Sequence, residues 1–383
     1  MRVELSSVQQ EVRTRFAALF DDELMSDIRR MGESPTRSAV DPAGAAADAR
    51  TSRAAVWDAL VDLGATRLLV PEKFGGEDVG HGAVVVLCEL LGAALYQGPL
   101  LDTLLAQEVL LGSPDIEADR IAEIAAGAAV AVAPRATTAD VLHRPGGPLG
   151  DDGGALDGVR RFVGSVPECR YLLAVAAHDA GTRSALVAAD GLTVRRYDEV
   201  TRGQLFEVTF AGVPVLSWYV SGPTAWAKLV ARARIRHAAY LVGTAQGALD
   251  LAVSRARARR QFGRPIGRFQ ALAFRLAELA TRLTATRWFV RGAAAAVDVC
   301  ADTDADCLIR AAQALAMASD VVGWIVSTAM QVHGAHGLTE DADIQLFHRR
   351  ALVDRIWLGT PVELRQEVYP MLTLTLDNRL DTL

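Results

Sequence analysis

Three regions with different patterns of apolar and polar residues follow one another along the chain. From about residue 5 to 125, apolar residues recur at three- and four-residue spacing, for example Trp57, Leu60 and Leu63, which predicts amphipathic helices. From about residue 129 to 220, short apolar runs alternate with turn residues, which predicts a small antiparallel sheet or barrel. Beyond that stretch the helical spacing returns.

The C-terminal region carries the clearest helical pattern. A helix start is expected at Ser221–Thr224, where Ser, Gly and Pro precede an apolar run. Further helices are expected over about 304–332 and 361–374, and long helices of this kind typically build a four-helix bundle. Between them, one helix is expected to run to about residue 298, because one of its faces is apolar, formed by Phe269, Leu272, Leu276, Leu279 and Leu283.

The length of the chain predicts several domains. It has 383 residues, 51% of them hydrophobic, which exceeds the size at which a single core keeps growing. We therefore expect an α+β multidomain protein with an N-terminal helical domain at 1–128, a middle small β-barrel or β-sheet domain at 129–220 and a C-terminal four-helix bundle domain at 221–383.

Charge and cysteine content exclude several classes of partner. The net charge of −6 argues against nucleic acid, and no uninterrupted apolar run is long enough to suggest a membrane span, so we expect a cytoplasmic protein. The four cysteines have no metal-ligand or disulfide-framework spacing and are expected to be small buried hydrophobes; they are Cys88, Cys169, Cys300 and Cys307. No metal site is expected.

Three local motifs stand out. Arg259–Gln270 reads R-R-Q-F-G-R-P-I-G-R-F-Q and joins two predicted helices, and Gln331–Gly337 reads Q-V-H-G-A-H-G. Taken alone, an arginine at a helix end is usually solvated and a phenylalanine there usually belongs to the core. The third motif, Pro71–Gly76, is glycine-rich but follows a helix rather than a strand, so it is not expected to bind a dinucleotide.

Together these motifs resemble the acyl-CoA dehydrogenase family over essentially the whole chain. The hairpin matches the family pattern R-x-Q-F-G-x-P-I-x-x-F-Q almost letter for letter, and the second motif resembles Q-x-x-G-G-x-G with Ala335 replacing the second glycine. The resemblance implies that both motifs reach across a subunit interface to the adenosine diphosphate half of an FAD held mainly by a neighbouring chain. The cofactor-binding residues it implies are Arg259, Gln261, Phe262, Gln270, Gln331, Gly334 and Thr360.

The residues that would carry the family's chemistry are missing. The reaction removes a proton next to a thioester carbonyl and passes a hydride to the flavin, so it needs a positioned carboxylate. The family commonly places that carboxylate in a Y-E-G-T tetrapeptide, and the matching position here is Leu358. Other members place it before an arginine that matches Arg234, which is implied to lie on the substrate side, but the preceding residue is Ala233. His237 lies nearby, although a lone histidine among arginines is more often structural.

The predicted sheet region departs from the family in the same direction. Members that hold their own flavin carry T-E-P-x-x-G-S-D and W-I-T-N stretches, which contact the isoalloxazine. The corresponding stretches here are Ala131–Asp140 and Phe162–Ser165, and Gly164 replaces the threonine expected beside the flavin N5. Residues for the chain's own active site are therefore lost, whereas residues for a neighbour's flavin are kept.

This one-sided loss predicts a subunit of a heteromeric, α2β2 acyl-CoA dehydrogenase. Its expected partner is a homologous subunit with the catalytic Glu or Asp, its substrate a bulky acyl-CoA such as a steroid side-chain thioester, and its electron acceptor an electron-transfer flavoprotein. Two alternatives remain open. A flavin-dependent monooxygenase or N-oxidase on the same fold needs no such base, and a non-catalytic scaffold would bind acyl-CoA without flavin.

Overall fold

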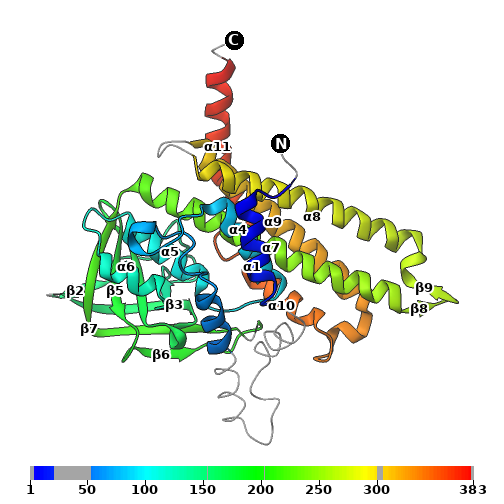
Figure 1. Ribbon diagram of the computed structural model, residues 1–383, viewed down its shortest axis with the longest axis horizontal. Helices are drawn as coiled ribbons and strands as arrows, with labels where there is room; N and C mark the ends of the chain where they lie inside the picture. The colour runs from blue at the N-terminus through cyan, green and yellow to red at the C-terminus, as the bar shows by residue number, and fades with distance from the viewer. Residues whose placement is uncertain (1–3, 21–52, 153, 202, 300–304, 381–383) are drawn as a thin grey trace, which may run out of the picture. The chain divides into compact units, whose positions relative to one another are not determined.

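The computed structural model describes residues 4–20, 53–152, 154–201, 203–299 and 305–380 (Figure 1). The chain divides into two compact units. We call one the helical unit, with Met1–Gly32, His81–Tyr96 and Arg234–Leu383, and the other the sheet unit, with Glu33–Gly80 and Gln97–Ala233. Helical segments before and after a curled sheet confirm the predicted fold class, and the division into three domains stays a prediction.

The sheet unit is built on a seven-stranded sheet with the order β1-β4-β5-β7-β3-β2, in which β6 also pairs with β7. All pairs are antiparallel except β1 with β4. The long strand β7 pairs with β5 through its C-terminal half and with β3 and β6 through its N-terminal half, so it joins the two halves of the sheet. The strands are β1 (Val130–Ala133), β2 (Gly150–Asp152), β3 (Ala155–Gly164), β4 (Tyr171–His178), β5 (Gly181–Ala188), β6 (Thr193–Arg196) and β7 (Leu205–Ser221).

Helices of the sheet unit cover the free edge of β1. The 3-10 helix η2 (Glu72–Phe74), α5 (Leu100–Leu111) and α6 (Ala118–Ala125) belong to this unit. Thr103 on α5 accepts a hydrogen bond from the Val130 amide at 3.0 Å, and Asp102 accepts one from the Val132 amide at 3.1 Å. Unpaired strand edges are prone to non-native pairing, so these contacts protect β1.

The glycine-rich Pro71–Gly76 turn has a packing role. It contains η2, and a Cβ atom on Gly76 would lie 1.8 Å from the carbonyl oxygen of Val70. Only glycine permits so close a backbone approach. The geometry explains the motif without a bound phosphate, as the helix before it predicted.

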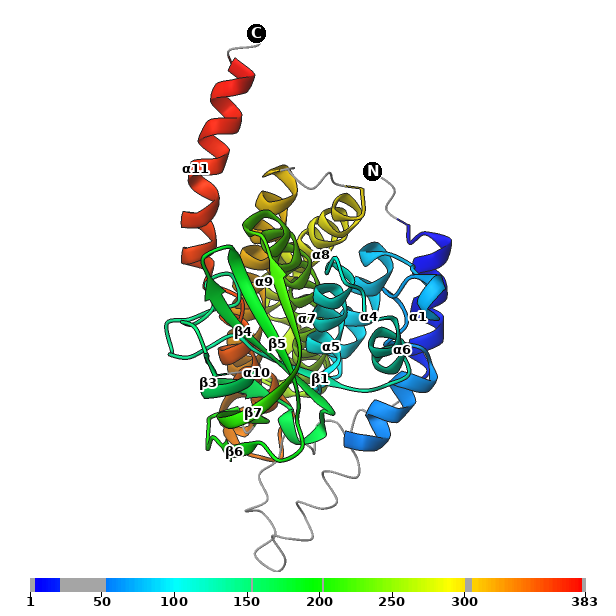
Figure 2. The ribbon, with the colours of Figure 1, turned by 90° about the vertical axis from the view of Figure 1, so that its left-hand side faces the viewer.

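The helical unit contains the predicted long helices. They are α1 (Ser7–Ala17), α4 (His81–Ala93), most of α7 (Pro223–Ala258), α8 (Gln270–Val297), α9 (Ala305–His333), the 3-10 helix η5 (Gly334–Leu338), α10 (Ile344–Asp354) and α11 (Pro361–Leu380). The predicted stripe on α8 is confirmed, because Leu276, Leu279 and Leu283 are buried. Helix α11 extends further than predicted, and Figure 2 shows its C-terminal end running away from the other helices.

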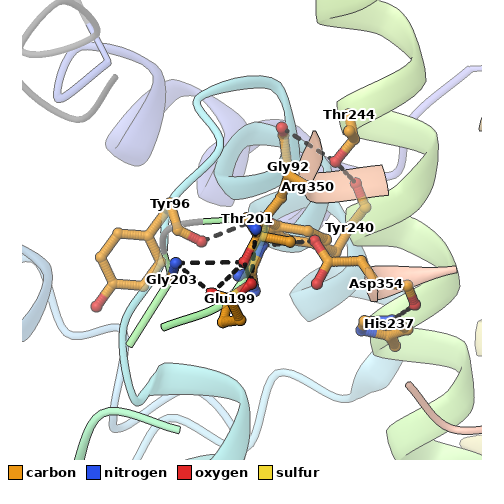
Figure 3. A network of polar contacts seen from close by, with 10 residues as sticks. All are labelled: Gly92, Tyr96, Glu199, Thr201, Gly203, His237, Tyr240, Thr244, Arg350 and Asp354. Carbon is orange, nitrogen blue, oxygen red and sulfur yellow. Dashed lines mark hydrogen bonds and ion pairs between the residues drawn. The ribbon is translucent and has the colours of Figure 1, made fainter. Parts of the chain in front are cut away.

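Helices α4 and α7 cross with their backbones in close contact at two glycines. A Cβ atom on Gly92 would lie 1.9 Å from the Tyr240 carbonyl oxygen, and one on Gly243 would lie 1.9 Å from the Glu89 carbonyl oxygen. Thr244 secures the crossing, since its hydroxyl donates to the carbonyls of Gly92 and Tyr240 (Figure 3). Glu89 in turn binds Arg287 and Arg291 of α8.

Two observations qualify the expectations from composition. The segment Ala305–Leu338 is long and apolar enough to cross a membrane, but 56% of its most apolar window is buried in the fold, as in the core helix of a soluble enzyme. Cys88 and Cys169 are buried thiols, as expected. Cys307 is disulfide-bonded, which corrects the expectation that it is a free thiol. The cytoplasmic location stays a prediction.

Candidate functional site

The conserved-looking hairpin of the sequence is a tight β-turn that projects an aromatic ring. Strands β8 (Arg260–Gln261) and β9 (Arg264–Pro265) are joined by Phe262 and Gly263, whose φ angles are 51° and 78°. Two positive φ values suit a two-residue hairpin loop, but a bulky residue rarely adopts one. The Phe262 side chain is nonetheless 91% exposed. Strained backbone that displays an unburied aromatic is typical of a binding element.

A groove beside the hairpin brings the two sequence motifs together. It has a volume of about 470 Å³ and lies between the start of α8 and the end of α9. Gln331 therefore lies in the same groove as Ile266, although 65 positions separate them, and Gln270 is exposed at the first position of α8. The lining residues are Ile266, Ala271, Leu272, Arg275, Ser327, Thr328, Gln331 and Val332.

The hairpin region is strongly positive. The chain has no Asp or Glu between Asp250 and Glu278, and this interval holds the arginines 255, 257, 259, 260, 264, 268 and 275. Arg259 is exposed and makes no side-chain hydrogen bond or ion pair within the described part of the chain. A planar guanidinium that is free in this way suits the bidentate binding of a phosphate.

The second motif forms an open turn. Helix α9 ends at His333, and Gly334 opens η5 with a φ of 62°. Nothing lies within 4 Å of the position that a Cβ atom on Gly334 would occupy. Glycine is therefore favoured here by backbone conformation, and the exposed turn leaves room for a ligand or a partner chain.

The loop that carries the base in related sequences is held by Arg234. Leu358 is buried, and its carbonyl oxygen accepts a hydrogen bond from Arg234 Nε at 3.4 Å. Arg234 is 3% exposed, and its two terminal nitrogens each lie 2.8 Å from the carboxylate of Glu367 on α11. The sequence analysis missed Glu367, because its spacing from Arg234 has no local signature. A direct contact between Arg234 and substrate stays a prediction.

Thr360 caps α11. Its hydroxyl accepts a hydrogen bond from the Glu363 amide at 3.2 Å, and its own amide donates to the Glu363 carboxylate at 2.8 Å. This reciprocal arrangement is a capping box, which satisfies free donors at a helix start. The structural role is sufficient to account for Thr360, and its expected contact with the cofactor stays a prediction.

His237 is a buried structural residue. Its Nε2 lies 2.7 Å from the Asp354 carbonyl oxygen, and its ring stacks on Tyr240 with 6.0 Å between centroids (Figure 3). Burial lowers its pKa below the ordinary value. Because a carbonyl accepts, Nε2 carries the proton of the neutral ring. The geometry supports the structural interpretation over the catalytic one.

We expect acid to destabilise the helical unit through His237. The folded state favours the neutral ring, so this contribution is fully present above the unfolded pKa of about 6.5 and is lost as the pH falls below it. His237→Gln should therefore reduce the slope of unfolding free energy against pH between about pH 7 and 5. Denaturant unfolding at several pH values measures this slope. The same change at the exposed His178 is the control, and equal slopes for His237→Gln and the unmutated chain would contradict the assignment.

The sheet unit does not fit an isoalloxazine ring in the way the resemblance would require. The Val132 amide, in the stretch that matches T-E-P, is already bonded to Asp102. Phe162 adopts a φ of 55° and stacks on Tyr197 with 4.9 Å between centroids. Gly164 has no hydroxyl, and nothing lies within 4 Å of where its Cβ would be. The helical unit thus retains groups that suit the phosphates of FAD, whereas the sheet unit lacks the hydroxyl that would address the flavin ring.

Comparison with known proteins places the chain in a family. The model of the acyl-CoA dehydrogenase C-terminal domain matches residues 221–366. Acyl-CoA dehydrogenase IpdE2 of Mycolicibacterium smegmatis is 30% identical over 315 residues, which cover 80% of this chain and 85% of that protein. The chain belongs to the acyl-CoA dehydrogenase family. This confirms the expected oxidoreductase class, and FAD is confirmed as its cofactor because related structures of the family are flavoproteins.

Two solved structures match nearly the whole chain. A variant of the Tcur3481-Tcur3483 steroid ACAD has a TM-score of 0.80 and 26% identity, covering 97% of this chain and 98% of that one. The ChsE4-ChsE5 complex from Mycobacterium tuberculosis has a TM-score of 0.77 and 22% identity, covering 97% and 99%. The second match shows the fold alone, which is that of the acyl-CoA dehydrogenases.

Proposed function

We propose that this chain is a subunit of a heteromeric, FAD-dependent acyl-CoA dehydrogenase that lacks its own base and completes the FAD site of a homologous partner subunit. One observation carries the proposal. The exposed, positive hairpin and its groove are intact, whereas both base positions are apolar, with a buried Leu358 and a buried Ala233. A chain that served its own flavin would need both sets of residues.

The chain's own residues would bind and orient the cofactor. FAD supplies the hydride acceptor when it is bound. Arg259 would bind the pyrophosphate through its guanidinium fork, and Gln331 would offer its amide beside the groove. Phe262 would bury its exposed ring against the partner subunit, with Gln261 and Gln270 flanking it. The proton next to the thioester carbonyl would go to a carboxylate of the partner, because position 358 offers none.

The proposed substrate is a bulky acyl-CoA, such as a steroid side-chain thioester. The support is the likeness to a protein whose title names a steroid ACAD. The pairing of two chains in the ChsE4-ChsE5 complex supports a homologous partner subunit. Electron-transfer flavoprotein is the proposed acceptor of the electrons. A flavin-dependent monooxygenase would instead consume oxygen and turn over without a partner chain, which distinguishes that alternative directly.

Restoring the base alone should not create a dehydrogenase. We expect Leu358→Glu to leave the unpartnered chain inactive towards acyl-CoA, because the Gly164 region still lacks the hydroxyl that would orient a flavin. A base without an aligned acceptor contributes little. The measurement is acyl-CoA oxidation by an artificial electron acceptor, with Leu358→Gln as the matched control. Turnover by the Leu358→Glu chain near that of the partnered complex would contradict the proposal.

A further inference from the structure

We propose that Glu367 is a positioning residue that supplies the counter-charge of Arg234 in place of a carboxylate at position 358. This rests on the proposed function in one respect, since it takes the loop around Leu358 as a site that has lost its base. The observation is the bidentate pair between Arg234 and Glu367, with both N–O distances at 2.8 Å. Arg234 also donates to the Leu358 carbonyl at 3.4 Å.

The burial of Arg234 explains why a carboxylate is needed. The guanidinium is always protonated, and its side chain is only 3% exposed. A charge held away from water is costly unless it is paired and hydrogen-bonded. Glu367 is itself 39% exposed, so one side of the pair stays in contact with solvent and the cost of burying it is limited.

The pair joins three segments of the helical unit. Arg234 lies on α7, Leu358 lies in the loop before α11, and Glu367 lies on α11 itself. One helical turn before Glu367, Glu363 forms the capping box with Thr360. Two carboxylates of α11 therefore fix the same loop, one through its helix cap and one through the buried arginine.

The neighbourhood of Arg234 has a natural place for one carboxylate. A Cβ atom on Gly359 would lie 3.9 Å from an Arg234 terminal nitrogen, so side chains of this loop begin next to the guanidinium. A glutamate at 358 would compete with Glu367 for the same fork. Two carboxylates around one buried guanidinium would repel each other, whereas either one alone would neutralise it. The charge has thus moved by nine positions, from the loop to the helix, where the bidentate pair keeps Glu367 from acting as a base.

The test is a charge-relocation cycle in the full chain, without flavin or partner. Glu367→Gln should raise the unfolding equilibrium constant about ten- to a hundredfold, because it leaves the buried Arg234 without its counter-charge. Adding Leu358→Glu to Glu367→Gln should recover most of that loss, whereas adding Leu358→Gln should recover little. In the chain that keeps Glu367, Leu358→Glu should not stabilise at all.

The control is Glu278→Gln on α8. Glu278 also pairs with arginines, Arg275 and Arg282, but this cluster is exposed, so the change should be near neutral. Unchanged stability of Glu367→Gln would overturn the proposal. Equal rescue by Leu358→Gln and Leu358→Glu would also overturn it, because side-chain size rather than charge would then be responsible. Since no partner or flavin enters the measurement, its failure leaves the proposed function standing, and an active homomer would refute that function without changing this cycle.

Discussion

Replacing Arg259 with alanine is expected to strip flavin from the complex of this chain with its partner subunit. The charge-assisted hydrogen bonds from a guanidinium fork to a pyrophosphate are worth about 1.5–3 kcal/mol. Their loss should weaken flavin binding roughly ten- to a hundredfold. The flavin absorbance per complex should fall, although the catalytic carboxylate lies on the other polypeptide.

Two further variants separate the fork from charge in general. Arg259→Lys should rescue flavin binding only in part, because an ammonium group cannot bind in the bidentate manner. Arg268→Ala removes an equally exposed arginine nine residues away and should be near neutral. A complex that carries Arg259→Ala with full flavin content would show that this subunit does not complete its neighbour's cofactor site.

Adding one methyl group at Gly243 is expected to have the largest effect on folding. The new Cβ atom would lie 1.9 Å from the Glu89 carbonyl oxygen and 2.8 Å from the carbonyl carbon. Both are backbone atoms of a packed helix, so α4 and α7 would have to move apart. We expect Gly243→Ala to cost about 3 kcal/mol or more, or to abolish soluble expression, since overpacking a tight contact forces backbone shifts.

Gly292→Ala is the matched control for this effect. Gly292 also lies inside a helix, α8, but nothing lies within 4 Å of its hypothetical Cβ. The same substitution should there be neutral or stabilising by about 0.5–1 kcal/mol, because alanine has the better helix propensity. Thermal unfolding compares the two variants. A Gly243→Ala chain that melts with the unmutated one would mean that the backbones at this crossing are not in contact.

The helices were predictable because their signal is local. The stripe from Phe269 to Leu283 repeats every three or four residues, and α8 ends at Val297, within one residue of the expected end. The grouping of α5 and α6 with the sheet was not predictable. It depends on contacts such as that from Asp102 to Val132, in which each residue type is ordinary and only the fold makes them neighbours.

The candidate site divides in the same way. The hairpin around Phe262 and the turn at Gly334 have fixed backbone demands, so their residue types mark them in the sequence. The groove that joins Gln331 to Ile266 arises from the packing of α8 on α9, which no spacing along the chain records. The Arg234–Glu367 pair spans 133 positions, and charged residues at that separation are informative only once the fold is known.

The most direct test of the account is the flavin content of this chain with and without a homologous partner that carries the catalytic carboxylate. Flavin is released from purified protein and counted per polypeptide, in parallel with acyl-CoA oxidation. The account predicts that the chain alone is nearly free of flavin and inactive, and that the heteromer is yellow, active and sensitive to Arg259→Ala. A yellow and active homomer of this chain would contradict it.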